Sequence, residues 1–305
     1  MSRPQQDVDE LFDIKNFYYI GHYQQCINEA QKLRKPSSPE ISLERDIFTY
    51  RAYMAQRKFL VVMDEIKASS PEVLQPLKML AEYLHQKNKH DAILAELENL
   101  MSGNIPDNSN LLLLVAATIY SIENNYEAAY KVLHISETIE TMAFCVDLLL
   151  KINRLDAAKK KLKEMQELDE DATLTQLAQA SVNVAIGGDK IQEAFYIYQE
   201  MIDKYGSTPL LLNGQAVALI AQRKLEEAGV ALQEALDRDP NHPDTLVNLI
   251  VLSYQSGKEP EVAKRYLSQL RDSNADHPYI RDMQIKENDF ERVCGQYTFS
   301  KPVSV

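Results

Sequence analysis

The sequence has 305 residues, a formal net charge of −12 at neutral pH, 45% hydrophobic residues, 9 glycines and 12 prolines. The negative charge disfavours nucleic acid and anionic membranes as direct partners, because both attract basic surfaces. So few glycines and prolines favour helices over an all-β fold, which uses turn residues freely.

Segments that would target or anchor the chain are not recognisable. Residues 1–10 are polar and acidic, and the longest apolar run, residues 111–117, is too short to span a bilayer. The three cysteines, Cys26, Cys145 and Cys294, lie far apart, which is typical of buried reduced thiols. We therefore expect a cytosolic protein without disulfides.

The first hundred residues predict three helical hairpins of irregular spacing. We place them at about residues 7–34, 41–69 and 72–101, separated by Ser- and Pro-rich segments at 36–39 and 69–71.

From residue 110 onward, alanines recur at positions expected in the second helix of each hairpin. Two antiparallel helices approach to about 8–10 Å where the contact residues are small. The steps between these alanines are 30, 36, 34 and 35 residues, and the alanines are Ala128, Ala158, Ala194, Ala228 and Ala263.

The clearest repeat begins at Pro209. Pro209, Pro243 and Pro278 follow one another at intervals of 34 and 35 residues. Proline is well tolerated at the first position of a helix, and a helix start that recurs every ~34 residues is typical of tetratricopeptide-like arrays.

These patterns predict an all-α protein, a right-handed superhelical solenoid of tetratricopeptide-like helical hairpins. We expect about eight hairpins in residues 1–276, a capping helix in residues 277–297 and a tail in residues 298–305. An amphipathic helix near 278–294 is expected to cover the apolar face of the last hairpin, because the end of a solenoid needs a cap.

Catalytic, metal-binding and cofactor-binding motifs are not recognisable. Gly187 and Gly188 lack the strand and lysine of a phosphate-binding loop and predict a turn. His85 and His90 are five residues apart, whereas zinc ligands on a helix prefer four. A cluster of acidic residues predicts a solvated loop: Glu164, Glu167, Asp169, Glu170 and Asp171. We therefore expect no enzyme, no cofactor, no metal and no small-molecule substrate.

The first helices of such arrays line a concave surface that holds another protein. Tyrosine suits an interface, and asparagine can hydrogen-bond the backbone of an extended guest. For every candidate the alternative is packing between hairpins, or, for the asparagines, a structural hydrogen bond. The candidates are Tyr50, Tyr53, Tyr83, Leu113, Ala117, Tyr120, Asn213, Val217, Ile220 and Asn248.

Six segments resemble one family more closely than they resemble repeats in general. They are residues 9–16 (DELFDIKN), 21–30 (GHYQQCINEA), 169–178 (DEDATLTQLA), 210–216 (LLLNGQA), 245–253 (TLVNLIVLS) and 286–290 (KENDF). Together they resemble the epsilon subunit family of coatomer, from Asp9 to Gln296.

The resemblance implies a non-enzymatic COPI coat subunit that works in Golgi-to-ER and intra-Golgi transport, at the cytosolic face of Golgi membranes. It implies that the superhelix binds and stabilises the C-terminal domain of the alpha coatomer subunit, partly by curling around an extended hairpin of that partner. Membrane association would then be peripheral, through the heptameric coatomer.

Two other functions remain open, both of them those of a generic tetratricopeptide adaptor. One is a chaperone cofactor that clamps the carboxylate of a peptide tail, which needs convergent lysines and arginines on the first helices. Residues 209–220 carry none. The other is an attachment factor of the membrane-fusion machinery.

Overall fold

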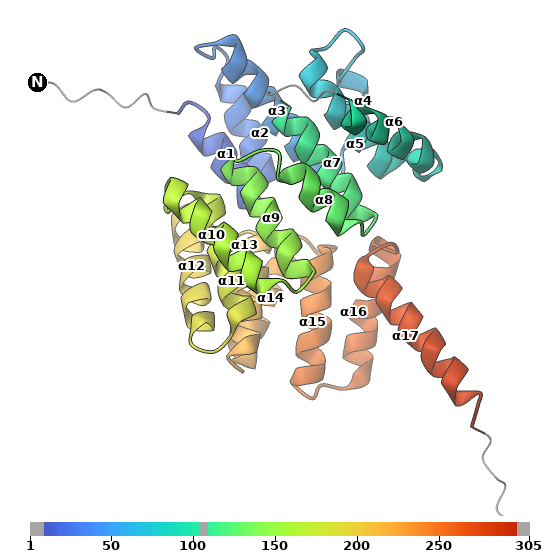
Figure 1. Ribbon diagram of the computed structural model, residues 1–305. Helices are drawn as coiled ribbons and strands as arrows, with labels where there is room; N and C mark the ends of the chain where they lie inside the picture. Colours follow the sequence, from blue (N-terminus) through green and yellow to red (C-terminus); the bar gives the residue numbers. More distant parts are fainter. Residues whose placement is uncertain (1–8, 104–108, 298–305) are drawn as a thin grey trace, which may run out of the picture. The chain divides into compact units, whose positions relative to one another are not determined.

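The computed structural model describes residues 9–103 and 109–297, and all regular structure in those ranges is helical (Figure 1). This confirms the all-α class of helical hairpins. The chain divides into two compact units, residues 1–208 and residues 209–305. The division does not coincide with the limits expected from the sequence, which remain a prediction.

The described residues of the first unit form six helical hairpins. Its helices are α1 (Phe12–Tyr19), α2 (Tyr23–Lys32), α3 (Pro39–Ala55), α4 (Phe59–Glu65), α5 (Gln75–His85), α6 (His90–Ser102), α7 (Asn110–Ile122), α8 (Tyr126–Leu133), α9 (Ile139–Lys151), α10 (Leu155–Asp169), α11 (Thr173–Ile186) and α12 (Lys190–Tyr205). Two short 3-10 turns, η1 (Glu72–Leu74) and η2 (Lys87–Lys89), precede α5 and α6.

Up to residue 297, the second unit forms two hairpins and a last helix. Its helices are α13 (Pro209–Ala221), α14 (Leu225–Arg238), α15 (Pro243–Gln255), α16 (Pro260–Ser273) and α17 (Pro278–Cys294). The three prolines that set the sequence period therefore begin α13, α15 and α17, as expected. Proline fits there because its missing N–H would have no partner inside the helix.

A small or β-branched residue is buried at the fourth position of the second helix in seven of the eight described hairpins. In α12 the equivalent Ala194 is the fifth residue. The seven are Cys26, Val62, Ile93, Ala129, Ala158, Ala228 and Ala263. The expected mark at Ala128 is wrong by one residue, since Ala129 is fully buried and Ala128 is not.

The turns inside six hairpins share one backbone conformation. A residue with positive φ follows the first helix, and its N–H and the next N–H bond back to carbonyls of the last turn, as in a Schellman motif. In the α13–α14 turn, Arg223 has φ of 63°, and the Lys224 N–H donates to the Leu219 carbonyl at 3.0 Å. The six residues are Gly21, Arg57, Asn124, Asn153, Arg223 and Gly257.

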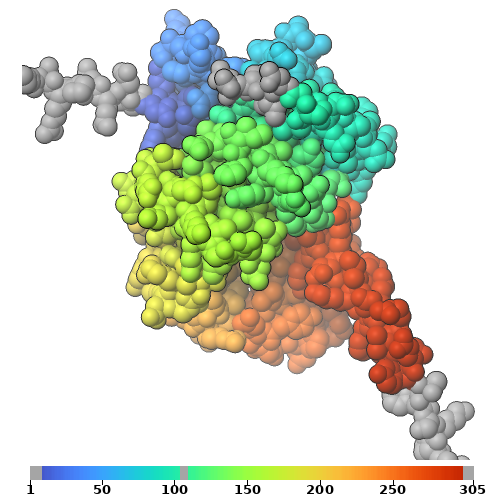
Figure 2. Space-filling model, viewed as in Figure 1, coloured from blue at the N-terminus to red at the C-terminus, as the bar shows by residue number. Residues whose placement is uncertain are grey.

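Helix α17 does not act as the expected cap along its full length. Ile280 is its one buried residue, whereas Phe290 is 70% exposed and Ile285 and Val293 are also exposed. Figure 2 shows the C-terminal part of this helix, in red, standing away from the hairpin of α15 and α16. Its first turn alone covers the apolar face of the second unit, through Ile280 and Tyr279.

Replacement of Ala228 by glutamate should open the α13–α14 hairpin. Ala228 is fully buried where the two helices meet. A carboxylate placed there would be withdrawn from water at an apolar helix contact, so we expect a loss of about 3 kcal/mol or more in the free energy of unfolding, measured by urea denaturation. The matched control is Glu227→Ala, one residue earlier and exposed. Equal unfolding midpoints for the two variants would contradict the packing described here.

Replacement of Arg223 by glycine should stabilise the second unit. A side chain in the left-handed region strains the backbone, and glycine removes that strain while retaining the turn. We expect a gain of about 0.5–1 kcal/mol, seen as a higher midpoint of urea denaturation. Arg223→Ala is the control, because it removes the contact of Arg223 Nη1 with Gln255 Oε1 (3.3 Å) but keeps the β-carbon. A glycine variant no more stable than the alanine variant would contradict this explanation.

Candidate partner-binding site

The first helices of the six hairpins in unit 1 form a closed ring. Contacts join α1 to α3, α3 to α5, α5 to α7, α7 to α9 and α9 to α11, and α11 returns to contact α1. An open superhelix would leave its first and last hairpins apart. In this unit they meet.

Buried polar contacts hold the two ends of the ring together. The Thr173 hydroxyl, at the start of α11, donates to Asn16 Oδ1 of α1 at 2.6 Å. Beyond α12, the Thr208 hydroxyl donates to the Ile20 carbonyl at 2.7 Å. Asn16, Thr173 and Thr208 are all buried. Because an unpaired buried polar group costs free energy, these contacts fix the position of α1 against α11.

Arg51 of α3 lies inside this ring. Its guanidinium carbon is 4.5 Å from the centroid of the Tyr18 ring of α1, within cation–π range. Arg51 Nη2 also donates to Glu140 Oε1 of α9 in an ion pair. In the order of the ring, α3 and α9 are not neighbours, so this ion pair reaches across the ring rather than along it.

The groups around Arg51 keep it charged. Burial by itself lowers the pKa of Arg51, but the neighbouring Tyr18 and Glu140 outweigh burial and raise the pKa above its ordinary value. The pKa of Tyr19, next to this site, is also raised, first by burial and then by Glu140. The site therefore presents a permanent cation beside the neutral Tyr19 at physiological pH.

The cysteines near the ring are inert. Burial raises the pKa of the Cys26 thiol to about 12 and that of Cys145 to about 11, and the thiolate is the reactive form. Both are free and buried, as expected, but Cys294 is exposed, which corrects the expectation of three buried thiols. Cys294 lies on the part of α17 that does not pack.

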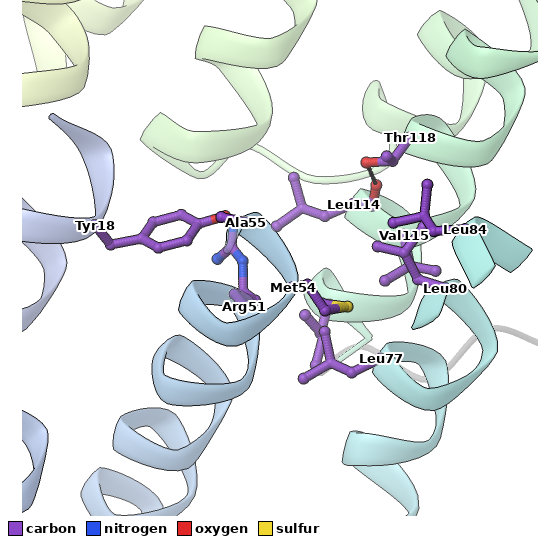
Figure 3. A pocket seen from close by; sticks show the side chains of 11 residues that line it. Tyr18, Arg51, Met54, Ala55, Leu77, Leu80, Leu84, Leu114, Val115 and Thr118 are labelled. Atoms are coloured by element: carbon purple, nitrogen blue, oxygen red, sulfur yellow. Dashed lines mark hydrogen bonds between the residues drawn. The ribbon is translucent and has the colours of Figure 1, made fainter. Parts of the chain in front are cut away.

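A cavity of about 210 Å³ opens next to Arg51 (Figure 3). Tyr18 and Arg51 lie on one side of it, and the leucines of α5 and α7 lie on the other. The hydroxyl of Thr118 donates to the Leu114 carbonyl of its own helix at 2.7 Å. Its lining residues come from α1, α3, α5 and α7, and they are Tyr18, Arg51, Met54, Ala55, Leu77, Leu80, Leu84, Leu111, Leu114, Val115 and Thr118.

The size and lining of the cavity suit a side chain of another protein. Ligand pockets usually have volumes of about 300–1,000 Å³, whereas a cavity of about 150 Å³ already holds a benzene ring. The lining is apolar apart from Tyr18, Arg51 and Thr118. Within residues 9–103 and 109–297 there is no cluster of three or more potential metal ligands. The cavity can therefore bind an apolar group beside a charge.

Five of the ten candidates from the sequence are buried and do not form a surface. They are Tyr83, Leu113, Ala117, Asn213 and Ile220. Their expected exposure is wrong because neighbouring helices, second helices included, cover these side chains. Tyr83, for example, stacks on His90 with ring centroids 4.0 Å apart, and its hydroxyl donates a hydrogen bond to Glu123.

Asn213 and Asn248 form structural hydrogen bonds within the second unit, which was the alternative to binding a guest. Asn213 Nδ2 donates to the Thr245 hydroxyl at 2.7 Å, and Asn248 Nδ2 donates to Asn213 Oδ1 at 2.8 Å. These bonds join α13 to α15. The amides therefore set the register of neighbouring hairpins.

The remaining candidates, Tyr50, Tyr53, Tyr120 and Val217, are half-buried. The three tyrosines pack against the core beneath α3, α5 and α7, and none of them lines the cavity. Their role in binding stays a prediction. Gly187 and Gly188 form the turn before α12, and the acidic cluster at 164–171 is exposed.

The residues at the centre of the ring were missed by sequence reasoning. Arg51 carried one local signal: it is a cation that directly precedes buried Ala52 and follows buried Phe48 by three residues. A charge on the apolar face of a helix needs a partner. That partner is Glu140, which lies 89 residues away in the sequence. No local sequence pattern marks it as the partner.

Comparison with known proteins identifies the family. The family model of the coatomer epsilon subunit matches residues 7–298. Coatomer subunit epsilon-1 of Arabidopsis thaliana is 38% identical over 289 residues, covering 95% of this chain and 97% of that protein. Coatomer subunit epsilon of Caenorhabditis elegans is 36% identical over 290 residues, covering 94% of this chain and 98% of that protein.

Solved structures agree on the fold. A tetratricopeptide repeat protein from Parabacteroides merdae superposes with a TM-score of 0.58 at 14% identity, covering 85% of this chain and 96% of that one. A chain of the APC/C hetero-tetramer Cut9–Hcn1 gives a TM-score of 0.60 at 13% identity, covering 91% of this chain and 55% of that one. Identities this low support the hairpin fold alone.

Within the described ranges, no helix combines the length and apolar character needed to cross a membrane. The sequence relationship extends over nearly the whole chain, and it shows that this chain belongs to the coatomer epsilon subunit family.

Proposed function

We propose that this COPI coat subunit binds and stabilises the C-terminal domain of the alpha coatomer subunit, and that it serves coat assembly in Golgi-to-ER and intra-Golgi transport. In this proposal it acts as a non-enzymatic scaffold at the cytosolic face of Golgi membranes and associates with them through coatomer. The family relationship supports membership of the coat.

The observation that carries the proposed binding is the apolar cavity inside the ring of first helices. Leu84 of α5 lines it and is 39% exposed, although leucine favours burial. A partner segment that enters the ring would cover Leu84 and its neighbours.

The adaptor that clamps a carboxylate with several cations has less support. Arg51 is the one cation among the residues that line the cavity, and Glu140 already neutralises it. A single cation of this kind does not make a convergent clamp. A coat scaffold that buries apolar area along a preformed surface agrees better with the leucine lining.

The proposal predicts that Leu84→Asp weakens binding to the purified C-terminal domain of the alpha subunit. Aspartate at this position replaces an apolar side chain that the partner segment would cover, so we expect a loss of roughly tenfold or more in affinity, measured by isothermal titration calorimetry. Leu60→Asp is the matched control. Leu60 belongs to the same unit and is 57% exposed, but it lies on the second helix α4, outside the cavity.

The two variants should have the same circular dichroism spectrum as the parent. If Leu84→Asp and Leu60→Asp bind equally well, the cavity is not the binding surface. If the parent chain itself fails to bind the alpha domain, the proposed partner is wrong.

A further inference from the structure

Arg51 is an unusual residue for its position. Its side chain is 14% exposed, and buried Phe48 and Ala52 flank it on α3. Withdrawal of a guanidinium from water is costly unless acceptors replace the lost hydration. Phe48 and Tyr18 supply ring faces at 5.2 and 4.5 Å, which offer cation–π attraction but no hydrogen-bond acceptor.

The hydrogen bonding of Arg51 is incomplete. A guanidinium carries five N–H donors and pairs best with a carboxylate through two parallel hydrogen bonds. In the part of the chain that the structure describes, the one acceptor of Arg51 is Glu140, bound through a single nitrogen, Nη2. The remaining donors belong to a residue that lines the cavity. They are available to a group that enters it.

Glu140 is suited to release Arg51. It is the second residue of α9, in the first turn, where the unpaired N–H groups and the dipole of a helix favour a carboxylate. It is also partly exposed, at 22%. A carboxylate that leaves Arg51 at this position retains stabilisation from the helix and from water. Release of Glu140 is therefore less costly than release of a fully buried partner.

The cavity supplies the second half of a binding site. Leucines of α5 and α7 form a wall that faces Arg51 (Figure 3), and the volume of about 210 Å³ fits one large apolar side chain. A ligand that both pairs with Arg51 and fills the cavity carries a carboxylate next to a large apolar side chain. An extended acidic–apolar peptide segment has this chemistry, with its side chains within reach of each other.

We propose that Arg51 and the adjoining leucine cavity form a subsite for an acidic–apolar segment of a partner protein. In the free chain, Glu140 pairs with Arg51 in place of the partner's carboxylate. The proposal deepens the proposed function, on which its link to the alpha subunit rests. Binding exchanges one carboxylate for another on the same guanidinium. The ion pair across the ring is then a competitor that sets the affinity of the subsite.

The test compares Glu140→Gln and Arg51→Gln in the full chain, with the purified alpha C-terminal domain as the probe. Removal of the competing charge in Glu140→Gln should strengthen binding, by about fivefold. Removal of the cation in Arg51→Gln should weaken binding by roughly tenfold or more. The double variant should bind as weakly as Arg51→Gln alone. If both single variants weaken binding, the ion pair is only a structural clamp and the proposal is overturned.

A second measurement tests the subsite without the alpha domain. Nitrogen-15 NMR of the Arg51 side chain is recorded while the peptide acetyl-Asp-Phe-amide is added at millimolar concentration to the Glu140→Gln chain. We expect its side-chain Nε–H signal to shift with this peptide and to stay in place with acetyl-Asn-Phe-amide. Absence of a shift with the acidic peptide overturns the subsite, even where the alpha domain binds. A shift in a chain that does not bind the alpha domain supports the subsite and rejects the partner.

Discussion

The contact between α1 and α11 is the constraint on which the first unit depends. A stack of hairpins exposes an apolar face at each end, and natural arrays cover these faces with polar caps. Unit 1 instead brings the first helix of its first hairpin against the first helix of its sixth. This contact buries Asn16 of α1, which bonds to Thr173 of α11, whereas Ile14 of the same helix packs against α2 and α3.

The polar groups at this closure give it a defined geometry. Leucines and alanines pack in many registers at similar free energy, whereas buried hydrogen-bonding groups are satisfied in few. The bond from Thr173 to Asn16 and the ion pair between Arg51 and Glu140 each join helices that are far apart in sequence. In the free chain they specify one diameter for the ring. The cavity, and the function that we propose for it, follow from that diameter.

The sequence predicts the repeated part of the fold well because the determinants of a hairpin are local. Prolines begin α13, α15 and α17 where the period places them, and Ala158, Ala228 and Ala263 occupy the close contact of their hairpins. The first three hairpins lack that signal because Cys26, Val62 and Ile93 take the place of alanine. The error at Ala128 arose because two alanines are adjacent, and helix α8 begins one residue later than the repeat suggests.

The candidate site could be predicted only in outline. First helices do line the interior, but which of their side chains remain exposed depends on how tightly the hairpins curve. Leu113 and Ala117 pack into cores shared with neighbouring helices, and Asn213 bonds to Thr245 of the next hairpin. Closure joins residues up to 188 positions apart. Periodicity within one hairpin carries no information about such contacts.

Crosslinking of α1 to α11 tests the closed ring most directly. The chain would carry Asn16→Cys and Thr173→Cys with Cys294→Ser, because the side-chain oxygens of Asn16 and Thr173 are 2.6 Å apart. A short thiol-reactive crosslinker, followed by peptide mass spectrometry, should join residues 16 and 173 at high yield. The pair Asn213→Cys and Asn248→Cys is the control, since these side chains meet at 2.8 Å in neighbouring hairpins. Efficient crosslinking of the control with none between 16 and 173 would show that the ring is open.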